Sequence, residues 1–458
     1  MKIPMTETKH LANRVANIKY QNLSEKTVRM SKQYILDYLG NSIRGWTQNN
    51  MVIMSEVLGV STDGTSATMF NGKKNAKNSV LYAAMLNSAA SHSLDMDDLH
   101  NSSIIHVACV TVPSVLAVAE DEGLGGKDII ASLVAGYEAG ARIGESIIPE
   151  SYHFWHTTAT CGTFSSAVAV ANLKKFNTEQ MVQCLGSAGT QAAGLWEFLI
   201  DGAMSKTLHV AKANFAGILS VKLTEKGFTA ANKILEGEKG FCLAMLANPH
   251  WDVLTADIDS YKIDENSFKP YACCKHTHSS NYAAQLLRSE HNLKLEDIDS
   301  VLIKSNSVVK SLVDNDKPQN PYGAKFSIQY CVSAMIKFGK LDVSEFTDEH
   351  LADKEIQRAM KNFTVEVDPK LERQFKKNPG QYSADVTIKD KKGNIWNKYM
   401  ECAKGDPPNP MTWEESVEKF LSLSEPIYGK EICEKLCKMV DTLEEYHDFK
   451  EILADCFK

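Results

Sequence analysis

Apolar side chains recur every three or four positions through the first part of the chain, up to about residue 260. This spacing is typical of amphipathic helices that bury one face. Ser24 is a suitable N-cap for the first clear helix, whose apolar positions are Val28, Ile35, Leu36, Leu39 and Ile43. Further helices are predicted over residues 80–94, 110–119, 129–148, 162–173, 178–193 and 205–224. The pattern therefore predicts a large helical domain.

Small residues recur within these helices. Gly136, Gly140 and Gly144 recur every fourth residue, which in a soluble protein indicates close backbone approach between helices. Residues 101–119 and 151–173 carry no formal charge, but Pro113, Gly162 and several His, Ser and Thr residues interrupt them. Such interrupted stretches favour burial in protein over burial in lipid.

The pattern changes near residue 268, where alternation of apolar and polar side chains begins. Strands are predicted over residues 301–306, 363–368, 382–389 and 394–400, with helices at 279–289 and 324–338. Residues 391–393 (Lys-Lys-Gly) predict a hairpin turn between the last two strands. After Pro407 and Pro408, helices are predicted at 413–423 and 428–441.

These elements predict a fold that is mainly α with an α+β part. A large all-helical domain would comprise residues 1–266 and 403–458, and a smaller α+β lid domain, residues 267–402, would be inserted into it.

Composition narrows the class of protein. The 458 residues carry a net charge of −7 and no dense Lys/Arg stripe, so nucleic acid is not an expected partner. The first fifteen residues lack the apolar segment of a secretory signal, and we expect a cytoplasmic protein without membrane association. The eleven cysteines are scattered and form no Cys-x-x-Cys pair, which argues against a disulfide framework, a zinc ribbon or an iron–sulfur cluster.

Several nucleotide-binding and hydrolytic motifs are absent from the sequence. It contains no Gly-x-x-x-x-Gly-Lys-Ser/Thr phosphate loop and no Gly-x-Ser-x-Gly nucleophile elbow. The glycine cluster at residues 123–126 follows a predicted helix instead of a strand, so it is not a dinucleotide-binding turn. Kinase, hydrolase and dehydrogenase functions therefore lose support.

Residues 91–106, SHSLDMDDLHNSSIIH, form the segment richest in titratable groups. Its carboxylates and imidazoles are Asp95, Asp97, Asp98, His92, His100 and His106. Such a segment between two apolar stretches suits proton transfer near a charged small molecule. The alternative is a solvated loop with a helix-capping aspartate.

Two further segments place a titratable group among small residues. His156 lies just ahead of a predicted helix, where free backbone N–H groups favour a bound carboxylate; the alternative is a hydrogen-bonded core histidine. Lys206 is either a fixed cation for an anionic ligand or part of a solvated helix face with Lys212, and His209 follows one turn later.

The segment 269–278, KPYACCKHTH, opens the predicted lid domain. It offers Lys269, Cys274, Lys275 and His278 as candidate substrate-binding residues. Zinc binding by its cysteines and histidines is an alternative that adjacent Cys with His-x-His does not favour, because tetrahedral sites use other spacings. Tyr330 could offer a phenol to the same substrate or pack as a core aromatic.

The motifs DMDDLHNSSIIH, HTTATCGTF, DGAMSKTLH with NFAG, EGEKGF, KPYACCKHTH and AKFSIQYC, in this order, resemble those of the MmgE/PrpD family. That family includes 2-methylcitrate dehydratase, cis-aconitate decarboxylase and iminodisuccinate epimerase. The likeness runs over nearly the whole chain. It implies a large helical domain with a smaller α+β lid domain, a site between them, and a homodimer.

The resemblance also implies a set of site residues. Carried over position by position, the catalytic residues would be Asp95, His106, His156, Lys206 and Tyr330, and Lys269 would bind substrate. It implies chemistry on a small di- or tricarboxylate with no cofactor and no metal. The two lysines would hold carboxylates, one imidazole would move an α-proton, and the other would protonate the leaving group or the carbanion. Asp95 would orient an imidazole or hold a proton.

The chain departs from the family pattern at three positions. Leu99 replaces a frequent threonine, Val107 replaces a proline, and Cys274 lies where decarboxylases carry a histidine. These departures argue against cis-aconitate decarboxylation. The leading hypothesis is a cofactor-independent lyase that dehydrates a 2-methylcitrate-like hydroxy acid. The alternatives are a dicarboxylate epimerase, a cis-aconitate-type decarboxylase and a non-catalytic carboxylate-binding protein.

Overall fold

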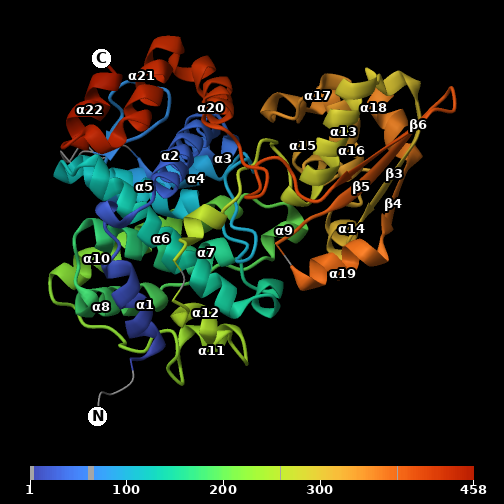
Figure 1. The fold of residues 1–458 in the computed structure, drawn as a ribbon. Helices are drawn as coiled ribbons and strands as arrows, with labels where there is room; N and C mark the ends of the chain where they lie inside the picture. Colours follow the sequence, from blue (N-terminus) through green and yellow to red (C-terminus); the bar gives the residue numbers. More distant parts are fainter. Residues whose placement is uncertain (1–4, 60–66, 258, 379) are drawn as a thin grey trace. The chain divides into compact units, whose positions relative to one another are not determined.

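The computed structural model describes residues 5–59, 67–257, 259–378 and 380–458 (Figure 1). The chain divides into two compact units. The first unit comprises Met1–Asn266 and Thr412–Lys458, and the second comprises Ser267–Met411. Helices dominate the first unit and a small mixed sheet lies in the second, which confirms a mainly α fold with an α+β part.

The first unit is built mainly from helices. Those that pack around its core are α1 (Glu7–Ala16), α2 (Glu25–Gly45), α4 (Val80–Ser91), α5 (Val107–Glu122), α6 (Gly126–Ile147), α7 (Thr157–Leu173), α8 (Thr178–Gly189) and α10 (Lys206–Glu225). The C-terminal segment adds α20 (Trp413–Tyr428), α21 (Lys430–Asp441) and α22 (Phe449–Cys456), and α20 packs on α2. Ser24 caps α2 through its side chain, as predicted.

Other elements of this unit are short. They are α3 (Asn49–Leu58), α9 (Phe198–Asp201), α11 (Phe241–Met245) and α12 (Trp251–Thr255), with the antiparallel strands β1 (Ala67–Thr68) and β2 (Lys77–Asn78). The sequence pattern did not predict this two-residue ladder, because two residues are too few to show a period of two.

Helices α5, α6, α7 and α10 form the centre of the first unit, and α5 and α7 are buried along almost their whole lengths. A Cβ on Gly136 would lie 2.6 Å from Thr111 Cγ2, and one on Gly140 would lie 2.9 Å from Ser165 Cβ. These distances confirm that the glycines permit close helix approach. No helix within the described residues is long and apolar enough to cross a membrane.

We predict that Gly136→Ala lowers the stability of the protein by about 1–3 kcal/mol, because the methyl group would overpack the contact between α6 and α7. Thermal or urea unfolding of the variant measures the effect. Gly323→Ala is the matched control, since its Cβ would meet no atom closer than 3.5 Å. Equal midpoints for both variants would contradict the prediction.

The second unit contains a four-stranded sheet in the order β4-β3-β5-β6. Its strands are β3 (Ile298–Ser305), β4 (Phe363–Val367), β5 (Ala384–Asp390) and β6 (Ile395–Met400). The predicted hairpin joins β5 and β6, with Gly393 at φ 91° in its turn. Strand β3 pairs antiparallel with β5 and parallel with β4.

Helices complete the second unit. Helix α13 (His278–His291) packs against β5 and β6, and α16 (Ile328–Phe338) packs against α13. Shorter helices lie around them: α14 (Ser307–Val313), α15 (Pro321–Ala324), α17 (Asp348–Leu351), α18 (Lys354–Ala359) and α19 (Pro369–Lys377). The helices predicted at 279–289 and 324–338 are thus confirmed, the second of them with a later start.

Candidate active site

The N-terminal ends of three long helices carry the candidate groups of the first unit. His106 is the N-cap residue of α5, His156 is the N-cap residue of α7, and Lys206 is the first residue of α10. Neither imidazole makes a side-chain capping bond to its helix. The helix dipoles and the free N–H groups of a first turn both favour a bound anion.

One carboxylate, Asp97, faces two imidazoles. Its Oδ2 lies 2.7 Å from His92 Nδ1 and 3.3 Å from His106 Nδ1, and all three side chains are buried or nearly so. The His92 and His106 rings meet edge to face with centroids 4.8 Å apart. Because an ionised carboxylate only accepts hydrogen bonds, Asp97 favours the tautomers with the proton on Nδ1, which leave Nε2 as a basic lone pair.

Lys206 and Asp95 form a second pair. The ammonium nitrogen lies 3.0 Å from Asp95 Oδ1, and the side chains are 12% and 7% exposed, so this lysine does not belong to a solvated face. Asp95 has φ 58°, a left-handed conformation that aspartate tolerates better than most residues. Asp95 therefore pairs with the lysine, whereas Asp97 contacts the His92 and His106 imidazoles.

His156 continues the imidazole cluster. Its ring stacks on that of His92 at 5.9 Å between centroids and contacts the Trp196 ring at 4.6 Å. Its Nδ1 lies 3.1 Å from Nδ1 of His209, on the first turns of α10. Burial, with the neighbouring His92 and Lys206, holds the pKa of His156 well below its usual range. The pKa of His92 is lowered to about 4, chiefly by burial.

Asp98 anchors the loop that carries these groups. Its carboxylate accepts hydrogen bonds from Ala108 N, from the Tyr137 hydroxyl at 2.8 Å and from Asn266 Nδ2 at 2.7 Å. Burial and the adjacent Asp97 raise the pKa of Asp98 to about 8, and the bonds from Tyr137 and Asn266 oppose that shift. The segment 91–106 is therefore a buried, hydrogen-bonded structure and not a solvated loop.

His100, in the same segment, predicts an acid-sensitive stability. Burial and nearby Lys262 lower the pKa of His100 to about 4 in the folded protein, against about 6.5 for an unfolded chain. The unfolded state binds the extra proton between these values, so stability is lost as pH falls from about 6.5 towards 4. We predict that His100→Gln makes this loss shallower by up to about 1.4 kcal/mol per pH unit.

Urea unfolding of parent and His100→Gln across this pH range measures that slope. Exposed His153 supplies the control, because His153→Gln should leave the slope unchanged. Parallel stability curves for the parent and His100→Gln would contradict the prediction.

Of the predicted residues in this unit, Asp95, Lys206, His106 and His156 lie in one connected neighbourhood through their contacts with His92, Asp97 and one another. The site prediction omitted His92, Asp97, His209 and Trp196. His92 and Asp97 belong to the segment that the sequence singled out for its titratable groups. For Trp196 we find no sequence signal.

The predicted residues of the second unit are buried within it. His278 Nε2 lies 3.1 Å from the Cys273 carbonyl, and Lys275 pairs with Asp406 at 2.8 Å. Tyr330 is fully buried in α16 and its hydroxyl donates to the Glu345 carbonyl. Lys269 and Cys274 are also buried. Substrate binding by these residues and a catalytic Tyr330 stay predictions.

Two groups among the described residues could hold a metal ion. One is His92, Asp97 and His106, whose ligand atoms lie within 4.8 Å of one another. The other is His100, Glu145 and Glu265, where the Lys262 ammonium already pairs with both carboxylates. The Cys and His side chains of residues 273–278 do not converge in this way, which gives the zinc alternative for that segment no support.

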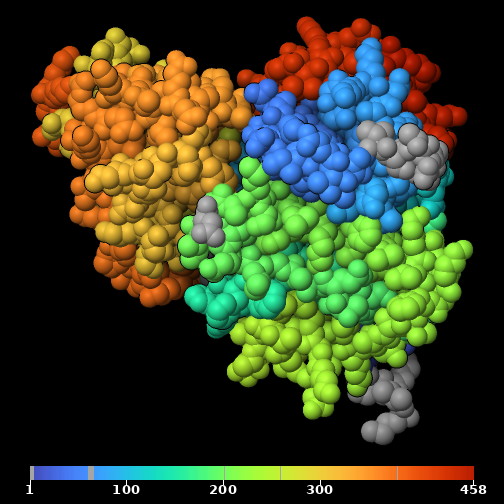
Figure 2. Space-filling view, turned by 180° about the vertical axis from the view of Figure 1, so that it is seen from behind, coloured from blue at the N-terminus to red at the C-terminus, as the bar shows by residue number. Residues whose placement is uncertain are grey.

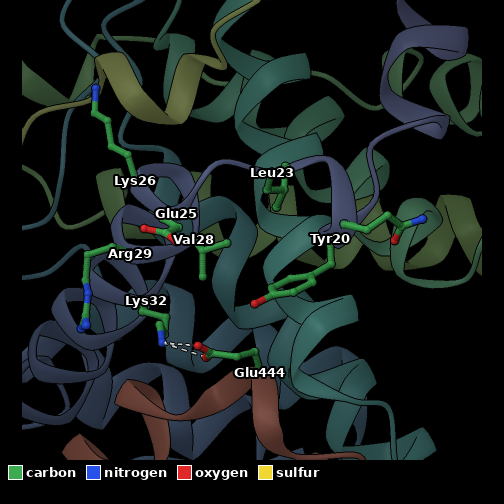
Figure 3. A pocket seen from close by; sticks show the side chains of 9 residues that line it. Tyr20, Leu23, Glu25, Lys26, Val28, Arg29, Lys32 and Glu444 are labelled. Carbon is green, nitrogen blue, oxygen red and sulfur yellow. Dashed lines mark hydrogen bonds and ion pairs between the residues drawn. The ribbon is translucent and has the colours of Figure 1, made fainter.

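A cavity of about 580 Å³ lies elsewhere in the first unit, at the start of α2 (Figure 3). Tyr20, Arg29, Lys32 and Glu444 contribute to its lining. The Lys32 ammonium is nearly buried and binds both oxygens of Glu444 and the Asp441 carbonyl. None of its lining residues belongs to the imidazole cluster, so we do not assign the candidate chemistry to this cavity.

Comparison with known proteins shows relatives that match over most of the chain. The chain is 24% identical to human cis-aconitate decarboxylase over 96% of this chain and 92% of that protein. It is 21% identical to the cis-aconitate decarboxylase-like protein oryM of Aspergillus oryzae, over 98% of this chain and 96% of the other. A cis-aconitate decarboxylase of Aspergillus terreus is 24% identical over 81% of this chain and 76% of its own length.

Family models match both units of the chain. The MmgE/PrpD N-terminal domain matches residues 9–254, which carry the three helix ends and their imidazoles, and the MmgE/PrpD C-terminal domain matches residues 271–445. With both domains matched in order and the motif resemblance thereby confirmed, this chain belongs to the MmgE/PrpD family.

Proposed function

We propose that this protein is a lyase that acts on a small di- or tricarboxylate by acid–base chemistry of its own side chains, without a cofactor. The observation that carries this proposal is that His106, His156 and Lys206 each lie at the N-terminal end of a helix, and that His156 interacts electrostatically with the other two. The positive N-terminal ends of the helices and the Lys206 ammonium suit binding of a substrate carboxylate. The neighbouring imidazoles suit proton transfer next to that carboxylate.

His106 is the candidate base. Asp97 facing its Nδ1 leaves Nε2 to remove a proton from the carbon next to a carboxylate. The negative charge that develops on the carboxylate would be stabilised by Lys206 and the helix N–H groups. His156, whose ring stacks on that of His92, would supply the proton that the leaving group or the carbanion needs.

The leading reaction is dehydration of a 2-methylcitrate-like hydroxy acid. Decarboxylation of a cis-aconitate-like acid is the second candidate, and the names of the curated relatives favour it. The same residues would serve both, because each reaction passes through a carbanion-like state next to a carboxylate. Loss of hydroxide requires an acid at the leaving oxygen, whereas loss of carbon dioxide requires one at the remaining carbon.

A panel of hydroxy- and unsaturated polycarboxylates, incubated with the protein in deuterium oxide, tests the proposal. Dehydration gives an unsaturated acid that absorbs in the ultraviolet, and decarboxylation releases carbon dioxide and leaves deuterium at the product carbon. Recovered substrate that carries deuterium, with no unsaturated acid, would indicate an epimerase instead. Binding without turnover, with equal affinity in parent and His156→Gln protein, would refute a catalytic function.

We also infer that the protein is a homodimer. Exposed apolar side chains lie on α3, on α9, on the segment that leads into α10 and on the first turn of α10: Val52, Ile53, Val57, Leu199, Ile200, Met204 and Leu208. Asn50 of α3 donates to Thr207 of α10 at 3.2 Å, and Figure 2 shows blue and green segments of this unit bordering one another. Exposed apolar side chains on neighbouring segments favour an interaction site.

The double variant Ile200→Asp, Leu208→Asp is therefore expected to sediment as a monomer in analytical ultracentrifugation, because two charges would be buried in the interface. Phe228→Asp, just beyond the C-terminal end of α10, is the control and should leave the parent's oligomeric state unchanged. A parent protein that sediments as a monomer at micromolar concentration would refute the inference.

A further inference from the structure

His156 and His209 form an imidazole pair, and the proposed reaction uses only His156. Their Nδ1 atoms lie 3.1 Å apart, so one ring donates and the other accepts. His156 is buried, whereas His209, one turn after Lys206 on α10, is half-buried. The pair therefore runs from the protein interior to a ring that solvent can reach.

The surrounding side chains fix the orientation of both rings. Trp196 packs on His156, and Phe198 meets His209 edge to face with centroids 5.4 Å apart. The Gly194 carbonyl accepts a hydrogen bond from the backbone N–H of His156 at 3.0 Å. A Cβ at Gly194 would lie 2.3 Å from Ala159 Cβ and 3.4 Å from His209 Nδ1, so the Gly194 backbone packs closely beside the pair.

Both rings are held neutral near neutral pH. Burial lowers the pKa of His156, with further lowering from His92, Lys206, His209 and His106. Burial also lowers the pKa of His209 to about 4, helped by Lys212 and Lys206. A neutral imidazole that gives up its N–H proton would become an anion. It avoids this only if its other nitrogen gains a proton in the same step.

We propose that His209 is the proton-relay partner of His156, which rests on the function proposed above. His156 donates its Nε2 proton to the substrate, and the N–H bond there breaks. At the same time His209 gives its Nδ1 proton to Nδ1 of His156. In the same step a solvent water protonates His209 at Nε2 and is left as hydroxide, so neither ring becomes an anion. The net transfer is one proton from solvent to substrate, and both rings end neutral with their protons on the opposite nitrogens.

In this relay, Asp97 and His209 have different effects on the imidazoles that they face. Asp97 keeps the proton of the facing imidazoles on Nδ1 and so favours basic Nε2 atoms, which suits His106 as base. His209 supplies Nδ1 of His156 with a proton and so favours donation from Nε2, which suits His156 as acid. The partner of each Nδ1 therefore decides between base and acid.

The test is turnover by His209→Ala with and without imidazole in the buffer. We expect kcat to fall by roughly 10- to 100-fold, with a KM change of less than about threefold, because the substrate-binding groups remain. Added imidazole should restore much of the loss, and the pH profile of kcat should change its acidic limb. His153→Ala, which removes an exposed imidazole, should behave like the parent.

A fall in kcat that imidazole does not rescue, in a variant that melts at the parent's temperature, would overturn the relay. So would an unchanged kcat and pH profile in His209→Ala. Nitrogen-15 shifts of the imidazoles provide a readout that needs no turnover. The Nδ1 resonance of His156 should move in His209→Ala and stay in place in His153→Ala.

These outcomes separate the relay from the proposed function. Absence of turnover by the parent with every acid in the panel would refute the lyase assignment. The nitrogen-15 comparison would still decide whether His209 controls the protonation of His156, and an unmoved His156 resonance would overturn the relay on its own. A parent that turns over substrate while His209→Ala loses nothing would overturn the relay and leave the lyase assignment intact.

Discussion

Lys206→Met is expected to lower kcat/KM by roughly 1,000-fold, the effect typical of removing one electrostatic stabiliser from a developing oxyanion. The ammonium is nearly buried and fixed by Asp95 at 3.0 Å, so it needs little reorganisation as charge develops on the substrate. Steady-state kinetics on the substrate identified in the panel would measure the loss. Lys206→Arg keeps the positive charge but replaces the ammonium with a planar guanidinium, so an intermediate loss of kcat/KM is expected.

Removing Lys206 also leaves Asp95 buried without this ion-pair partner, which would lower stability. Lys262→Met is a matched control, because Lys262 is also nearly buried and forms ion pairs with Glu145 and Glu265 in the same unit, and it lies beside His100, which has no part in the proposed chemistry. It should reduce the melting temperature and retain kcat/KM at the assay temperature. Full activity of Lys206→Met would remove the lysine from the proposed chemistry.

Asp97→Asn is the second substitution with a large expected effect. We predict a loss in kcat of roughly 1,000- to 10,000-fold, because an amide NH₂ would face an imidazole Nδ1 and favour the tautomer with no lone pair on Nε2. The substitution keeps the size of the side chain, so KM should change much less than kcat. Steady-state kinetics at temperatures where the variant is folded, together with its melting temperature, measure the effect.

Asp98→Asn provides the comparison for this variant. Asp98 is equally buried and accepts hydrogen bonds from Ala108, Tyr137 and Asn266, but it does not contact the imidazoles through any described hydrogen bond. The Asp98→Asn variant should be less stable than the parent, but its kcat should fall much less than that of Asp97→Asn. Equal losses of kcat in the two variants would mean that Asp97 acts by holding the loop and not by setting a tautomer.

The local elements of this protein could be predicted because their signals are local. The helix over residues 205–224 and the hairpin of β5 and β6 follow from periodicity and from turn residues such as Gly393. The parallel pairing of β3 with β4 could not be predicted, because more than fifty residues separate the strands and alternation does not specify a partner. The prediction of His156 ahead of a helix is confirmed by its place as an N-cap residue.

The sequence by itself determined the family, the mainly α fold with an α+β part, and the segments that carry titratable groups, because caps, periodicity and ordered motifs are written in neighbouring residues. Only the tertiary structure decided that Asp97 faces both His92 and His106, that Asp95 pairs with Lys206, and that His156 meets His209. Those contacts join residues up to 111 positions apart. They depend on how the helices cross and on which rotamers the packing permits, and no local pattern encodes either.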